Sequence, residues 1–263
     1  MNLFLREMKS NFKSLIIWSV CFAFLIVVGM IKFTTTGTDP KLFADVINQV
    51  PRFIRALFGF GNFDVSTLIG FYGIVNFYII LLAAVHSSFV ASHTISKEEQ
   101  EKTTEFLNVK PISRAKIIFL KLSAVFVNVL IINIVSAISS VLIMNYMSNG
   151  DSHTNEVIMM MVYVLIVQII FLFIGSAIAT LSRRPKLAAA RGTIVLVAAY
   201  LLSSLIDMFK ELEFLKYLTP FKYFNTADVL VNKPIDFIMV FITVFVVAGL
   251  CALTFKGYEK RDL

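Results

Sequence analysis

The sequence predicts an all-α integral membrane protein with six transmembrane helices. Hydrophobic residues make up 58% of the 263 residues, charged residues only 16%, and the mean hydropathy is +0.82. Soluble domains are about half apolar and about a quarter charged. Continuous apolar runs of about 18 residues or more can cross a hydrocarbon core roughly 30 Å thick as helices, and they lack the alternation of a β-barrel. We therefore expect one transmembrane domain, 1–263, with spans at about 15–31, 68–92, 117–146, 157–181, 187–209 and 235–255.

The segment that precedes the first span, residues 1–14, predicts a helix that lies in the membrane interface. Leu5, Met8 and Phe12 recur at helical spacing, and basic residues occupy another face. An amphipathic helix of this kind binds with its apolar side in the headgroup region. We expect an interfacial elbow helix here, followed by the first span.

Two segments between spans predict amphipathic helices on the extracellular side. The first covers Leu42 to Phe58 and is interrupted by Pro51, and the second covers Leu212 to Leu218 and ends before Pro220. Both place apolar residues at helical spacing, with aromatic residues of the type that anchors helices at headgroup level. We expect both segments to cap the outer side of the protein.

The orientation follows from the basic residues in the short loops. With the N-terminus inside, 16 of the 24 Lys and Arg residues fall on the cytoplasmic side. Cytoplasmic loops are enriched in Lys and Arg, so both termini are expected in the cytoplasm of a bacterial cell. Attraction to anionic membrane lipid accounts for the net charge of +7 without any nucleic acid.

A charged island separates the second and third spans. Residues 97–109 predict a short cytoplasmic helix, which Pro111 ends because the residue before a proline disfavours helical geometry. Ser113 then fits the N-cap of the next helix. From these features alone, the island is either a loop that sets topology or a surface for a partner, because charged faces are usually solvated.

The stretch "EKTTEFLNVKPISRAKIIFLK" resembles the first cytoplasmic loop of ABC-2 type ABC exporter permeases. The matching positions are Glu101, Thr103, Glu105, Leu107, Pro111, Ile112, Ser113, Arg114 and Lys121. Lys102 stands where the family usually has glycine. The resemblance continues in the N-terminal helix, in "VPRFIRALFGFGNFDVSTLIGF" and in "LKYLTPFKYFNTADVL", and so covers nearly the whole chain.

The resemblance implies the six-span fold of type V, ABC-2-like exporters, with residues 97–109 as the coupling helix. That helix would dock on a separate cytoplasmic ABC ATPase, present in two copies, which binds ATP and Mg. A second permease chain, identical or related, would complete the pathway for an amphipathic or hydrophobic substrate such as a peptide, drug or lipid. The residues implied in docking are Glu98, Glu101, Thr103, Thr104, Glu105, Phe106, Leu107, Pro111 and Arg114.

Four amide residues inside the spans are candidates for the substrate pathway: Asn76, Asn128, Asn133 and Gln168. Buried amides also join helices through hydrogen bonds, which is their more frequent role. No Asp or Glu lies near the middle of a span, and this disfavours an ion-driven secondary transporter. No convergent catalytic, cofactor or metal-binding set is expected, so the chain is not predicted to be an enzyme. The alternatives are a membrane scaffold or sensor subunit and a secondary transporter.

Overall fold

The computed structural model describes residues 3–35, 45–47, 49–60, 64–101, 112–148, 152–182, 184–224, 226–230 and 236–260. Among these residues every regular element is a helix. Six helices are long and apolar enough to cross a membrane, which confirms the predicted number of spans. They are α1 (Leu3–Thr35), α4 (Leu68–Gln100), α6 (Arg114–Met147), α7 (Thr154–Leu181), α8 (Ala188–Met208) and α10 (Phe237–Glu259).

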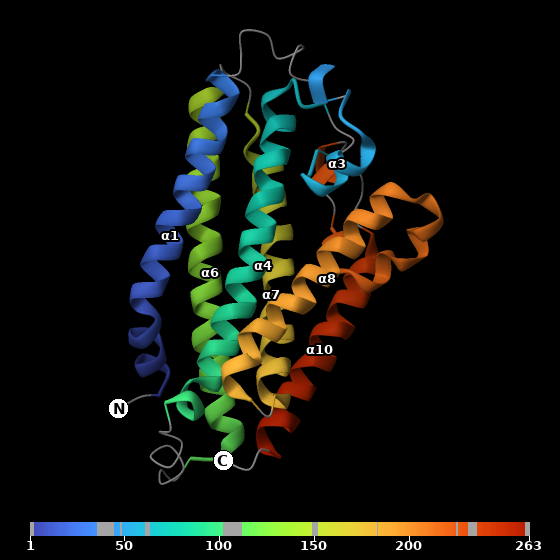
Figure 1. Ribbon diagram of the computed structural model, residues 1–263. Coiled ribbons are helices and arrows are strands. Elements are labelled where there is room, and N and C mark those ends of the chain that lie inside the picture. Colours follow the sequence, from blue (N-terminus) through green and yellow to red (C-terminus); the bar gives the residue numbers. More distant parts are fainter. Residues whose placement is uncertain are drawn as a thin grey trace.

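The start of α1 and the end of α10 lie at the same end of the helix bundle (Figure 1). We call this the inner end, and the opposite one the outer end. The end of α4 and the start of α6, which flank the charged island, also lie at the inner end (Figure 1). The helix ends that flank the predicted docking segment therefore lie on the same side as the start of α1 and the end of α10.

The predicted elbow and first span form one continuous helix. Helix α1 runs from Leu3 to Thr35 without the predicted boundary at residue 14. Its sequence holds no proline, and its first glycine is Gly29, so nothing local breaks the helix. At 1.5 Å per residue α1 is about 50 Å long, whereas a hydrocarbon core is about 30 Å thick. The amphipathic lead is therefore an extension of the span at the inner end.

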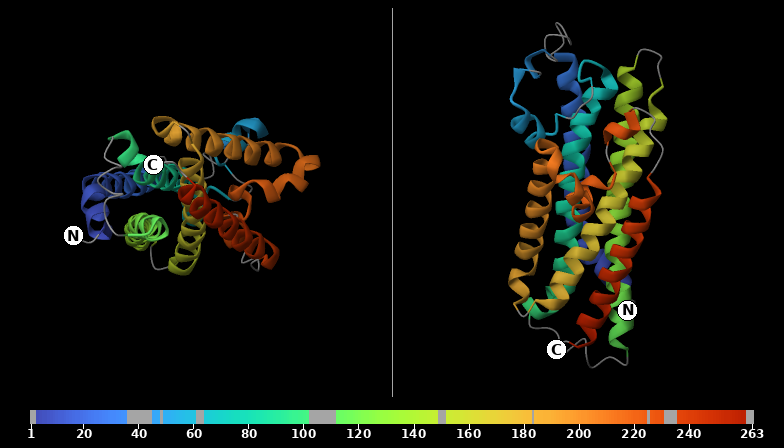
Figure 2. Two further views of the ribbon diagram at one scale, coloured as in Figure 1. Left: turned by 90° about the horizontal axis from the view of Figure 1, so that it is seen from below. Right: turned by 90° about the vertical axis from the view of Figure 1, so that its right-hand side faces the viewer.

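Helices α4 and α7 form the centre of the bundle (Figure 2, left). Helices α1 and α6 flank them on one side, and α8 and α10 on the other. The contact between α4 and α7 is close at Gly175, where an added Cβ would lie 2.5 Å from the backbone oxygen of Ser88. The Ser92 hydroxyl donates a hydrogen bond of 3.0 Å to the Gly175 carbonyl. Small residues at such crossings let helix backbones approach in membranes.

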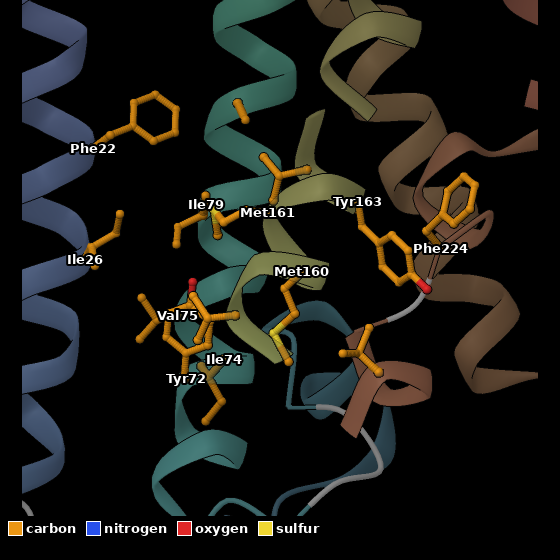
Figure 3. Packing of buried hydrophobic residues seen from close by; sticks show 14 of the residues in the cluster. Phe22, Ile26, Tyr72, Ile74, Val75, Ile79, Met160, Met161, Tyr163 and Phe224 are labelled. Atoms are coloured by element: carbon orange, nitrogen blue, oxygen red, sulfur yellow. The ribbon is translucent and has the colours of Figure 1, made fainter. Parts of the chain in front are cut away.

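The main apolar core joins α1, α4 and α7 (Figure 3). Phe22 and Ile26 of α1 point toward α4, whose Ile79 is fully buried. On the other side of α7, Tyr163 packs against Phe224 with ring centroids 4.9 Å apart. The core therefore extends from the first helix to the segment that follows α8.

Helices α8 and α10 are inclined to the rest of the bundle and are mostly exposed (Figure 1). Helix α10 presents large apolar side chains outward, including Phe237, Phe241 and Phe245. In a membrane such side chains are covered by lipid tails or by another helix at little cost. This face is compatible with both lipid and a second chain.

The outer segments fold onto the bundle. Helix α3 (Arg52–Leu57) packs on α8, and the second predicted helix is a 3₁₀ helix, η2 (Lys210–Leu218), which also contacts α8. Two short helices follow, η3 (Pro220–Lys222) and α9 (Thr226–Leu230), and both contact α4, α7 or α8. Residues 36–44 and 48, which include the first part of the predicted outer helix, lie outside the described residues.

Candidate functional site

The two ends of the charged island are fixed by helix structure. Helix α4 continues past the predicted membrane boundary to Gln100, and the exposed Glu101 follows as its C-cap. On the far side α6 begins at Arg114, and the Ser113 hydroxyl accepts a hydrogen bond from the Lys116 amide at 3.3 Å. The predicted N-cap at Ser113 is thus confirmed. Most of the predicted docking residues lie outside the described residues: Thr103, Thr104, Glu105, Phe106, Leu107 and Pro111.

Glu98, which the sequence places among the docking residues, is buried between two cations. One carboxylate oxygen accepts a hydrogen bond from Arg6 Nη2 at 2.8 Å, and the other lies 2.6 Å from Lys121 Nζ. Glu98 is only 7% exposed. Its side chain turns into the bundle because Lys121, which is fully buried, requires a negative partner. In this structure the Glu98 carboxylate contacts α1 and α6.

Lys121 holds a second polar contact that fixes its position. Its Nζ also donates to the backbone oxygen of Thr94, one turn before Glu98 on α4. A buried ammonium is tolerated when it is paired with a charge and its remaining hydrogens are satisfied. We refer to Arg6, Glu98 and Lys121 as the charge cluster.

Further polar contacts join the start of α1 to the end of α4. Asn11 Nδ2 donates to Thr94 Oγ1 at 3.2 Å, and Lys97 Nζ donates to the Ser10 hydroxyl. Arg6 also pairs with its neighbour Glu7 at 2.8 Å. The first turns of α1 are thus bound along the last two turns of α4.

Two further residues at the inner end, the predicted Arg114 and also Gln100, contact other helices. Arg114 Nη1 donates to the carbonyl of Glu259 at 3.0 Å, at the C-terminus of α10, where a positive charge is favourable. Gln100 Nε2 donates to the Pro185 carbonyl at 3.1 Å, in the 3₁₀ turn η1 (Pro185–Leu187) before α8. The ends of α4 and α6 are therefore in contact with α1, α8 and α10.

Two of the four predicted pathway amides make hydrogen bonds between elements. Asn76 Nδ2 donates to Thr226 Oγ1 of α9 at 2.9 Å, and Asn133 Nδ2 donates to the Met161 carbonyl at 3.1 Å. Asn128 Nδ2 and both amide atoms of Gln168 are buried and find no partner among the described residues. All four side chains are buried within one chain.

Sequence reasoning missed the roles of Arg6 and Lys121. The sequence places Arg6 only among the basic residues that set the orientation, and Lys121 among these and among the positions that match the family loop. A signal for Lys121 was present, because it interrupts the apolar run "IIFLKLSAVF" and a charge in such a helix needs a buried partner. Arg6 carries no comparable local signal. Among the described residues, no group of three or more His, Cys, Asp or Glu side chains could hold a metal ion.

These observations define a helical membrane protein that crosses the bilayer six times and has its loop-flanking helix ends bound together at one end. The sequence matches the family model described as "ABC-2 family transporter protein" over residues 1–263. The chain therefore belongs to the ABC-2 family of transporter proteins, the permeases of ABC transporters. Membership implies partnership with an ABC ATPase subunit. No curated protein matches the chain.

Proposed function

We propose that this chain is the permease subunit of an ATP-driven exporter. Two permease chains, identical or related, form a pathway between them, and two separate ATPase subunits bind ATP and Mg and open it. The observation that carries this proposal is the match to the ABC-2 family over the whole chain. The described residues form six spans and short connecting segments, which leave the energy source to another chain.

The docking surface for the ATPase is the segment between α4 and α6. Glu101 is exposed at its start, and the segment carries an acidic and apolar set that suits a groove on a partner: Thr103, Thr104, Glu105, Phe106 and Leu107. Pro111 and Arg114 set how the chain enters α6. Support comes from the hydrogen bonds at the end of α4 and the start of α6, which hold the two helix ends that flank this segment.

The substrate is an amphipathic or hydrophobic molecule such as a peptide, a drug or a lipid. Apolar helix faces rich in Phe suit such a molecule, and 26 of the 263 residues are Phe. Asn128 and Gln168 are the better pathway candidates of the four amides, because their buried polar atoms have no partner among the described residues. Since both are buried within one chain, a substrate would reach them only after helices separate.

Two substitutions in the docking segment test the function. Glu105→Lys reverses a charge at a partner contact, where loss of a buried ionic partner costs about 2 to 5 kcal/mol. Phe106→Ala removes an aromatic anchor, at about 2 kcal/mol or more if it is a hot spot. We expect both variants to lose ATPase in co-purification at equal expression in the membrane.

Matched controls at the outer end separate docking from general damage. Glu213→Lys and Phe214→Ala make the same changes in η2, at exposed positions. These controls should bind ATPase as the unmodified chain does, because exposed charges contribute about 0 to 1 kcal/mol. Full ATPase binding by the two docking variants would favour the alternative, a loop that only sets topology in a scaffold or sensor subunit.

A further inference from the structure

The charge cluster joins three helices that are far apart in the sequence. Arg6 belongs to α1, Glu98 lies two residues before the end of α4, and Lys121 lies in the second turn of α6. Glu98 contacts both cations, at 2.8 Å and 2.6 Å. The Glu98 carboxylate thus joins all three helices at this level, beside Thr94, which bonds Asn11 of α1 and Lys121 of α6.

The position of the charge cluster matters because Glu98 and Lys121 lie on the two helices that flank the docking segment. In the sequence, residues 102–111 lie between the end of α4, which carries Glu98, and the start of α6, which carries Lys121 seven residues after Arg114. The Glu98–Lys121 contact therefore closes this segment into a loop with a fixed base. Helix α1 is bound to the same helix ends by the Arg6–Glu98, Asn11–Thr94 and Lys97–Ser10 contacts.

The ionic contact restricts the relative position of the helices more than apolar packing does. Apolar side chains hold two helices together at many similar positions, because dispersion and hydrophobic contacts have little directionality. A buried carboxylate that bonds two cations favours one register, since a slide takes the buried Lys121 ammonium away from this partner, while Arg6 keeps its pair with Glu7. Burial of the Lys121 ammonium makes this penalty large.

We propose that Glu98 is a positioning residue that makes the inner ends of α1, α4 and α6 move as one body when an ATPase acts on residues 102–111. The inference rests on the proposed function. Through this base, a displacement of the docking segment reaches α1 at Arg6 and α6 at Lys121 instead of bending α4 alone. Glu98 acts in coupling without touching the ATPase itself.

The test measures a distance across the cluster in the purified complex of the full chain with its ATPase. Lys9→Cys on α1 and Lys116→Cys on α6, both exposed, carry spin labels. Their distance distribution is recorded by pulsed electron paramagnetic resonance, without nucleotide and after trapping with ATP and vanadate. The comparison variant replaces the cluster by apolar residues: Arg6→Leu, Glu98→Leu and Lys121→Met.

In the unmodified cluster we expect the same narrow distribution in both states. The apolar variant is expected to fold, because replacing a buried ion pair by apolar residues of similar volume is often neutral or stabilising. The apolar variant should have the unfolding temperature of the unmodified chain and should still bind the ATPase. Its distance distribution should broaden or shift after trapping with ATP and vanadate. Coupled movement is then lost without loss of folding or docking.

Two results would overturn the inference while the proposed function stands. One is a nucleotide-dependent shift of the distance with the cluster intact, and the other is an apolar variant whose distribution stays narrow and unchanged. If the apolar variant does not fold, Glu98→Gln with the same labels replaces it, and an unchanged narrow distribution again overturns the inference. A chain that binds no ATPase with its cluster intact would overturn the proposed function, and this inference with it.

Discussion

The inner end of this protein and the turn after α3 at its outer end are held by different chemistry, although an ion pair also joins Lys222 to Asp207 of α8 on the outer side. At the inner end, the buried charge cluster joins α1, α4 and α6. At the outer end, the turn after α3 is held by neutral groups: Tyr78 and Tyr200 donate their hydroxyls to the Phe58 and Leu57 carbonyls.

Neutral contacts also continue from the outer turn into the bundle. Gly59, at φ +72°, packs on the Phe77 ring, which lies 6.0 Å from the ring of Tyr200. Tyr200 in turn lies 6.3 Å from Phe221, which contacts Phe171 of α7 at 5.2 Å. Aromatic rings tolerate tilted and edge-on arrangements over a range of distances. The outer turn therefore rests on a surface that permits small shifts.

This difference in chemistry indicates which of the two regions resists movement more strongly. Removing one partner of a buried ion pair costs several kcal/mol, whereas a neutral hydrogen bond contributes about 1 kcal/mol. The inner end should therefore keep one register, and the outer turn should separate from the bundle at modest cost. The firmer contacts thus lie at the end where the ATPase is proposed to act.

The largest effect is expected from Glu98→Gln. The amide keeps the shape but removes the charge, so buried Lys121 loses its ionic partner, at about 3 to 5 kcal/mol. We expect a clearly lower unfolding temperature in detergent, followed by the loss of monodisperse protein on heating. The double variant Glu98→Leu/Lys121→Met is the control and should recover most of the loss. Equal unfolding temperatures for Glu98→Gln and the unmodified chain would contradict the ionic account of the inner end.

A smaller effect is expected between the two ends, at the crossing of α4 and α7. Gly175→Ala puts a Cβ 2.5 Å from a backbone oxygen of Ser88, so one helix must shift. Such overpacking costs about 1 to 3 kcal/mol. The control is Gly249→Ala on α10, where an added Cβ meets nothing within 4 Å. Thermal unfolding should separate the two variants, and an equal response would mean that the crossing is not tight.

The smallest effect is expected from Tyr200→Phe at the outer turn. The change removes one hydroxyl and keeps the ring, so it costs about 1 kcal/mol and increases the exposure of α3. A reporter cysteine, Ala56→Cys, should react faster with a membrane-impermeant maleimide in this background. Tyr146→Phe removes a hydroxyl from an exposed ring and should leave the rate unchanged. If Tyr200→Phe also leaves the labelling rate unchanged, the Tyr200 hydroxyl does not hold the turn after α3.

The sequence was sufficient for features that depend on local composition. Six apolar runs predicted six helices, and a serine before "RAKI" predicted the cap of α6, because hydropathy and capping depend on neighbouring residues. The continuity of α1 was missed because amphipathicity indicates an interfacial face without saying where a helix ends. The charge cluster was missed because it joins residues 92 and 23 positions apart in the sequence. Which carboxylate meets Lys121 is decided by helix packing, which one sequence does not display.

The central claim, that an ABC ATPase binds at the inner end, is tested most directly by photo-crosslinking in intact cells. A photoreactive amino acid replaces the exposed Glu101 beside the docking segment or, as a control, the exposed Ser152 at the outer end. Adducts are purified through a tag on this chain and identified by mass spectrometry. The account predicts an adduct with an ABC ATPase from position 101 and none from position 152. An ATPase adduct from position 152 would contradict the account. So would the absence of an ATPase adduct from position 101 when the ATPase co-purifies with the chain.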